Sequence, residues 1–157
     1  MLPNPDGELA NDELVRGEVV RAIRDLRPET VVACDPTAWF FEDVYYNHAD
    51  HRTAGAITLD AVFPGAGNPH FFAEHIAGGL EAWQVHDVWI AWTQGPNHRE
   101  DVTGFMERKI AALREHRSQV EGGMLGYFED WLQRDAEEEG RRIGAKHAES
   151  FRVLKLE

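Results

Sequence analysis

Two histidines with an aspartate between them form the segment of the sequence best suited to chemistry. His48 and His51 are three residues apart, and Asp50 lies between them. In a helical turn this spacing places both imidazoles on one side. Metal hydrolases need imidazole nitrogens, and usually a carboxylate, that converge on one metal with a coordination position left for water. The segment therefore predicts part of a zinc-hydrolase site, with Asp50 orienting a neighbouring imidazole.

The same spacing also fits an ordinary polar loop. The chain contains eight histidines, so a close pair arises readily by chance. Two histidines do not complete a zinc site, because zinc needs three or four protein ligands. A solvated pair is therefore the alternative that the residues leave open.

The elements before this segment are those of an α/β protein. Apolar residues at helical spacing predict a helix over residues 12–26. The short apolar run Thr30–Cys34 then predicts a strand buried on both faces, as in a parallel sheet. Ligands of open α/β sheets bind at the carboxyl ends of the strands. Asp35 follows this strand, so it either contacts a substrate or caps the turn at Pro36.

Further elements follow along the chain. Residues 35–50 read as a long aromatic loop, of a length that is usually functional. A second helix is expected from Asp50 or His51 to about Phe63, and a second strand over residues 85–92, where Trp89 and Trp92 are expected to be core residues. Residues 93–101 read as a polar loop, and helices are predicted over 102–120 and 127–146, separated by Gly122-Gly123. We predict a single α/β domain over residues 1–157.

Charge and composition exclude several classes of partner. The net charge is −12, which repels nucleic acid phosphates and anionic lipids, so neither is an expected partner. No apolar run approaches the length of a membrane span, and the first residues do not resemble a signal peptide. The single cysteine, Cys34, cannot form an intrachain disulfide. A cytoplasmic location is the expectation.

A resemblance to a known family sharpens this interpretation. The stretch Tyr46–Gly55 resembles the second signature of the PIG-L/LmbE-like deacetylases, which are zinc enzymes that remove acetyl groups from N-acetylglucosamine conjugates and similar amides. Four other stretches resemble family segments in the same order and extend the likeness over nearly the whole chain: residues 5–9, Arg24–Ala33, Lys109–Gln119 with its His-x-Ser-Gln ending, and Ala148–Phe151.

The resemblance implies roles for four residues in the chemical step. His51 matches the zinc-ligand histidine of the family, and Asp50 would orient a neighbouring imidazole. His48 matches the histidine that stabilises the tetrahedral oxyanion or moves a proton. Tyr46 matches an active-site tyrosine that polarises the acetyl carbonyl, with aromatic packing in the loop as the alternative.

Three further residues are candidates for substrate binding. Asp6 matches a carboxylate that contacts sugar hydroxyls, although an Asp-Gly turn explains it equally well. His116 would lie near the substrate pocket, but a histidine at a helix C-terminus also serves as a cap that favours the helix dipole. Asp35 completes this set.

One part of the family pattern is absent. The sequence contains no Ala-His-Pro-Asp-Asp-Glu segment, which in the family carries two of the three protein zinc ligands and the general base. The resemblance thus implies a Rossmann-like three-layer sandwich with a mostly parallel sheet, truncated at its N-terminus, and an incomplete ligand set for Zn²⁺. A fragment, one half of a split enzyme and a degenerate relative are the explanations left open.

The expected function is a zinc-dependent hydrolase that removes an acetyl group from a small-molecule N-acetylated sugar conjugate or similar amide. This chain would supply an incomplete part of that enzyme, and its macromolecular partner would be a missing N-terminal half or further copies of itself. The rival hypothesis is a non-catalytic binding or structural module that retains the second half of the deacetylase fold.

Overall fold

The computed structural model describes residues 4–41, 43–120 and 124–156. It has the α/β character that the sequence predicts, with helices and a mixed sheet. The chain divides into two compact units: a first unit of Met1–Gly95 with Arg152–Glu157, and a second unit of Pro96–Phe151. That these units make a single domain stays a prediction. None of the helices within the described ranges is both long and apolar enough to cross a membrane.

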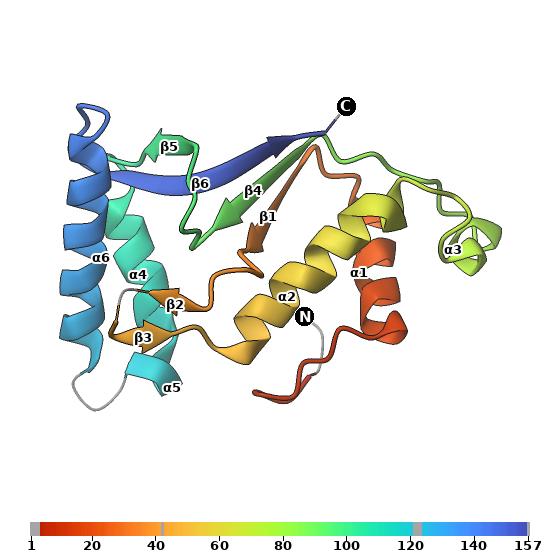
Figure 1. Cartoon of the computed structure of the whole chain (residues 1–157), viewed down its shortest axis with the longest axis horizontal. Coiled ribbons are helices and arrows are strands. Elements are labelled where there is room, and N and C mark those ends of the chain that lie inside the picture. The colour runs from red at the N-terminus through yellow and green to blue at the C-terminus, as the bar shows by residue number, and fades with distance from the viewer. Residues whose placement is uncertain (1–3, 42, 121–123, 157) are drawn as a thin grey trace. The chain divides into compact units, whose positions relative to one another are not determined.

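The first unit carries the segments that bear the candidate site (Figure 1). Its elements, in chain order, are α1 (Glu13–Leu26), β1 (Thr30–Cys34), β2 (Phe40–Phe41), β3 (Tyr45–Tyr46), α2 (Ala49–Asp60), the π-helical η1 (Ala61–Ala66), α3 (Ala73–Ala77) and β4 (Asp87–Ala91). The second unit contains β5 (His98–Asp101), α4 (Met106–Glu115), α5 (Arg117–Val120) and α6 (Met124–Arg141). The last strand, β6 (Ala148–Lys155), begins in the second unit and ends in the first.

The sheet contains both parallel and antiparallel pairs. In the first unit β1 pairs in parallel with β4, with Thr30 opposite Asp87 and Cys34 opposite Ala91, and β4 is followed in the sheet by β6. In the second unit β5 pairs antiparallel with β6. The parallel pair confirms a strand at residues 30–34, but the expected burial on both faces is wrong, because Val32 is 64% exposed. The strands β5 and β6 went unpredicted.

Most predicted helices are present with shifted ends. The helix over 12–26 is confirmed as α1, and α2 begins at Ala49, slightly before the predicted start. The predicted loop over 35–50 contains the two-stranded β2–β3 ribbon, and the helix over 102–120 is divided into α4 and α5. The predicted helix over 127–146 is α6, which ends at Arg141. The break at Gly122-Gly123 lies outside the described residues.

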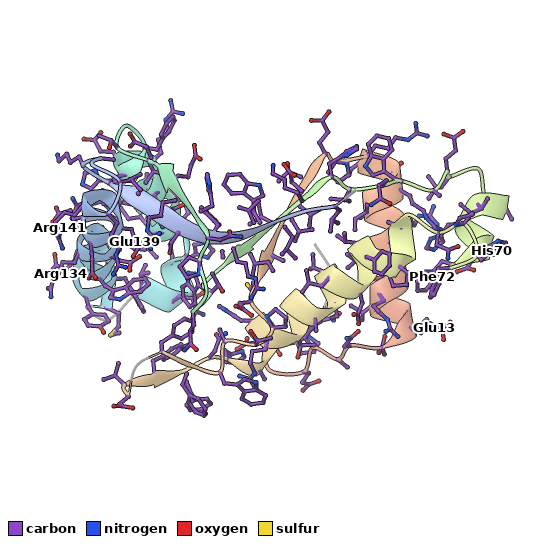
Figure 2. All side chains as sticks on the ribbon, turned by 45° about the horizontal axis from the view of Figure 1, so that its top comes forward. Glu13, His70, Phe72, Arg134, Glu139 and Arg141 are labelled. Carbon is purple, nitrogen blue, oxygen red and sulfur yellow. The ribbon has the colours of Figure 1, made fainter. Side chains whose placement is uncertain are left out.

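The core of the first unit joins α1, η1 and β4 around Val20, Val62 and Val88. Arg24 lies on α1 with only 1% of its surface exposed. Its guanidinium donates hydrogen bonds of 2.8 to 3.2 Å to five carbonyl oxygens, those of Gly65, Ala66, Asn68, Phe71 and Phe72. Phe72 lies beside α1 (Figure 2), where its ring would touch a Cβ added at Gly17. The buried charge is thus stabilised by main-chain dipoles that fix the course of residues 65–72.

In the second unit, the outer face of α6 is strongly charged. Arg134 projects from this face (Figure 2), and its side chain is 80% exposed. On the inner side, Arg99 of β5 donates to the Glu139 carboxylate at 2.7 Å. The charged residues of α6 therefore include a solvated set and the partly buried Glu139, which pairs with Arg99 and Arg142.

A close backbone contact positions α2 against the end of β1. Gly55 is buried in α2, and a Cβ added there would overlap the carbonyl oxygen of Cys34 and lie 3.1 Å from the nitrogen of Pro36. Only glycine allows the helix to approach the strand this closely. The start of α2 is therefore held near the carboxyl end of β1, where α/β sheets place ligands.

The turn after β1 is closed by the Asp35 side chain. Its Oδ1 accepts hydrogen bonds from the Thr37 amide at 2.7 Å and the Thr37 hydroxyl at 2.6 Å, and the residue is 6% exposed. Burial acts to raise the pKa of Asp35, but hydrogen bonds from Thr37 and Thr93 and the charge of Arg152 outweigh it and lower the pKa below its ordinary value. Asp35 thus caps the turn, which is the alternative that the sequence left open.

We expect Gly55→Ala to destabilise the first unit, because the clash is with backbone atoms that cannot rotate away. Overpacking of this kind lowers the free energy of unfolding by about 1–3 kcal/mol, measured by urea denaturation. Gly126→Ala in α6 is the matched control, since a Cβ there meets nothing within 4 Å and alanine favours a helix. Equal stability of Gly55→Ala and the natural protein would refute the proposed contact.

We expect Asp35→Asn to reduce the stability of the protein in a pH-dependent way. A carboxyl group whose pKa is lowered by folding stabilises the protein above its unfolded pKa, about 3.9, and this contribution is lost as the pH falls through the folded pKa. The free energies of unfolding of the two proteins should therefore differ at pH 7, and the difference should shrink as the pH falls below the unfolded pKa and through the lowered folded pKa. Asp43→Asn, at an exposed position, serves as control. A difference that is independent of pH would show that the charge contributes nothing.

Candidate active site

The first turn of α2 fixes the protonation pattern of His48. This residue is the N-cap of the helix, and its Nδ1 accepts a hydrogen bond from the Asp50 amide at 3.2 Å. A nitrogen that accepts a hydrogen bond carries no proton, so the proton of the neutral imidazole lies on Nε2. The His48 side chain is exposed. It therefore presents an N–H donor at the surface, which suits the stabilisation of a developing oxyanion.

The Asp50 carboxylate holds the N-terminal segment against the start of α2. Its Oδ2 accepts a hydrogen bond from the Gly7 amide at 2.6 Å and its Oδ1 one from the Leu9 amide at 3.3 Å. Gly7 has a φ of 83°, which favours glycine and forms the turn that presents both amides. Figure 1 shows this segment passing beside the beginning of α2. Asp50 thus positions residues 6–9 through its carboxylate, while its amide donates to the capping side chain of His48.

The hydrogen bonds from Gly7 and Leu9 to the Asp50 carboxylate bring Asp6 close to His48 and Asp50. Ligand atoms of Asp6, His48 and Asp50 all lie within 4.8 Å of one another. An open pocket of about 320 Å³ adjoins them and is lined by Asn4, Pro5, Asp6, Leu9 and Asp50. Residues far apart in the sequence therefore converge on a pocket that carries two carboxylates, with the His48 imidazole close to them.

His51 lies one turn along the helix from His48. The centroids of their rings are 6.1 Å apart, and the His51 side chain is exposed. Among the described residues, the group of side chains that could hold a metal ion together is Asp6, His48 and Asp50, and His51 is not part of it. Imidazole and carboxylate donors suit zinc, so the residue types at this helix start fit part of a zinc site.

The β2–β3 ribbon leads directly into this helix start. Tyr46 pairs with Phe40 across the ribbon and is 71% exposed. Asn47 anchors the ribbon, because its amide donates to the carbonyl of Trp39 at 2.7 Å and its side chain to that of Ala38 at 3.0 Å. Among the described residues, nothing donates to Asn47 Oδ1, although this atom is buried.

One predicted site residue, Asp35, does not join this cluster, and another, His116, belongs to the other unit. Asp35 is engaged in the turn after β1, as described above. His116 belongs to the second unit, where it is the C-cap of α4 and its carbonyl accepts from the amides of Gln119 and Val120. The C-cap position is one of the two roles that the sequence left open for His116, and a contact with substrate stays a prediction.

Trp92 is a residue that sequence reasoning misplaced. It was expected in the core of a strand ending at 92, but β4 ends at Ala91, and Trp92 is 45% exposed with a φ of 55°. A positive φ is rare for an aromatic residue and marks a constrained position. The apolar run through Trp92 concealed the strand end, because periodicity does not distinguish the last strand residue from the first residue beyond it.

Comparisons with known proteins agree with the resemblance. No family model matches the chain. The chain is 35% identical over 149 residues to the diacetylchitobiose deacetylase of Thermococcus kodakarensis, a match that covers 95% of this chain and 54% of that protein. It is 31% identical over 137 residues to the mycothiol S-conjugate amidase of Streptomyces coelicolor, which covers 86% of this chain and 39% of that protein. The chain thus spans about half the length of the first relative and less of the second.

Solved structures give the same picture of the fold. The N,N'-diacetylchitobiose deacetylase of Pyrococcus horikoshii, bound to its inhibitor, has a TM-score of 0.84 and 29% identity, with 97% of this chain and 55% of that chain covered. A conserved protein of Thermus thermophilus has a TM-score of 0.73 and 24% identity, with 98% of this chain and 64% of that chain covered, and shows the likeness of fold alone. The chain is therefore an α/β protein similar to deacetylases, and the PIG-L/LmbE-like family fits these relatives.

Proposed function

We propose that this chain belongs to a zinc-dependent PIG-L/LmbE-like deacetylase that removes the acetyl group from an N-acetylglucosamine-type conjugate. The observation that carries the proposal is the helix start at which His48 presents an Nε2–H donor beside Asp6 and Asp50. Similarity to a diacetylchitobiose deacetylase over 95% of the chain supports the same reaction class.

Each residue at or near the start of α2 has a separate role in amide hydrolysis. His48 donates a hydrogen bond from Nε2 to the carbonyl oxygen as negative charge develops on it. Tyr46, which is exposed two residues earlier, polarises the same carbonyl through its hydroxyl. Asp50 is a positioning residue, because its amide fixes the His48 tautomer and its carboxylate holds residues 6–9. Asp6 then accepts hydrogen bonds from sugar hydroxyls beside the pocket.

The metal would be held by His51 from this chain. A bound Zn²⁺ would supply a water of lowered pKa as nucleophile and polarise the acetyl carbonyl. Two further ligands and a general base would come from polypeptide outside these 157 residues.

The test is acetate release by the natural gene product, with any polypeptide that flanks these residues in the cell. With N,N'-diacetylchitobiose as substrate and added Zn²⁺, we expect acetate release that a chelator abolishes. His48→Gln should lower kcat by about 10²–10³-fold while zinc content is unchanged, because an oxyanion donor is lost but no ligand. His51→Ala should lose the zinc itself.

His70→Gln is the matched control, because His70 is an exposed histidine in the loop before α3 (Figure 2). It should retain the full kcat. An absence of acetate release from the zinc-loaded natural protein would contradict the proposed function. A fully active His48→Gln protein would instead refute the role given to His48.

A further inference from the structure

We propose that Trp92 forms a stacking platform for a pyranose ring of the substrate, next to the site of deacetylation. This inference rests on the proposed function, because it takes the ligand to be an amino-sugar conjugate. It concerns sugar binding, however, and not the hydrolytic step.

Trp92 lies at the edge of the sheet where ligands bind. β1 and β4 are parallel, and their last residues, Cys34 and Ala91, are paired, so the segments that follow both strands emerge side by side. Ligands of α/β sheets lie beyond these carboxyl ends. Trp92 is the first residue after β4, and its large side chain remains 45% exposed at a place where it would ordinarily be buried.

The segment around Trp92 is fixed on both sides. The carbonyl of Ala91 accepts a hydrogen bond from the Asp35 amide at 3.1 Å, and the Gln94 side chain donates to the carbonyl of Phe40. These contacts hold Trp92 in the left-handed region, which costs of order 1–3 kcal/mol for a residue other than glycine. A conformation maintained at this cost, which leaves an indole exposed, indicates a function for the indole.

A row of rings connects Trp92 with the candidate site. The centroid of Trp92 is 5.6 Å from that of His51, and His51 is 6.1 Å from His48. On the other side, the Phe41 ring meets Trp92 edge-on at 5.8 Å and stacks on Tyr45 at 6.0 Å. The indole is therefore one imidazole away from the residue that would hold the acetyl oxygen, with its orientation supported by Phe41.

The chemistry of this surface matches a sugar ring. A pyranose has an apolar C–H face and hydroxyl edges, so it binds to a flat aromatic ring with polar groups at the rim. Trp92 supplies the aromatic face, while Asp6 lies in the candidate site to accept hydrogen bonds from hydroxyls. A substrate with its acetyl group at His48 would thus extend its own ring or the next one over the indole.

The test is a titration of the 157-residue chain with N,N'-diacetylchitobiose after dialysis against a chelator, followed by NMR of the tryptophan indole N–H groups. The chain has five tryptophans, so each indole reports separately. We expect the Trp92 indole to shift saturably and the indole of Trp131, 42% exposed on α6, to stay unchanged. Trp92→Leu should raise the Kd about tenfold or more, and Trp92→Phe, which keeps a flat ring, should stay within about threefold.

Trp131→Leu is the matched control and should bind the sugar as the natural chain does. Unchanged affinity of Trp92→Leu, or a sugar titration that leaves the Trp92 indole unmoved, would overturn the platform. An indole that shifts with protein concentration alone would point to contact with a second copy of the chain and would also overturn it. Because no hydrolysis is measured, an inactive protein that still binds through Trp92 would refute only the proposed function.

Discussion

The close approach of α2 to the end of β1 is the constraint on which the candidate site depends. It requires a residue without a side chain at Gly55, because any Cβ would overlap the carbonyl of Cys34. The helix start, with His48, Asp50 and His51, is thereby fixed beside the turn that Asp35 closes. A backbone contact in the helix interior thus sets the place of three side chains one to two turns away.

The hydrogen bonds of the first turn of α2 give these side chains distinct roles. The Asp50 amide occupies Nδ1 of His48 and makes this histidine a donor, whereas the Asp50 carboxylate is engaged by Gly7 and Leu9. Of these three side chains, only the exposed imidazole of His51 takes no part in the hydrogen bonds just described. The asymmetry between two histidines three residues apart follows from their position, because only the N-cap residue can accept from the helix amides.

The sequence predicted those parts of the molecule that depend on local pattern. The strand at residues 30–34 is a short run of apolar residues, and the apolar residues of α1 recur at helical spacing. The two histidines of the candidate site are three residues apart, which is also a local pattern. The tether from Asp50 to Gly7 and Leu9 spans more than forty residues, and no local pattern encodes it. β5 went unpredicted because all four of its residues are polar or charged, and β6 because its charged residues at 149, 152 and 155 do not follow the alternation of a strand. Trp92 was misplaced because its role arises from a backbone conformation rather than from residue type.

We propose that this chain carries one imidazole ligand and an oxyanion-side donor, and not a complete metal centre. The zinc content of the purified 157-residue chain, measured after dialysis, tests this claim most directly. Because one imidazole holds zinc weakly, we expect well below one equivalent per chain. Tight zinc at one equivalent per chain that is lost on His51→Ala would contradict the account, because it would require a full ligand set within these residues.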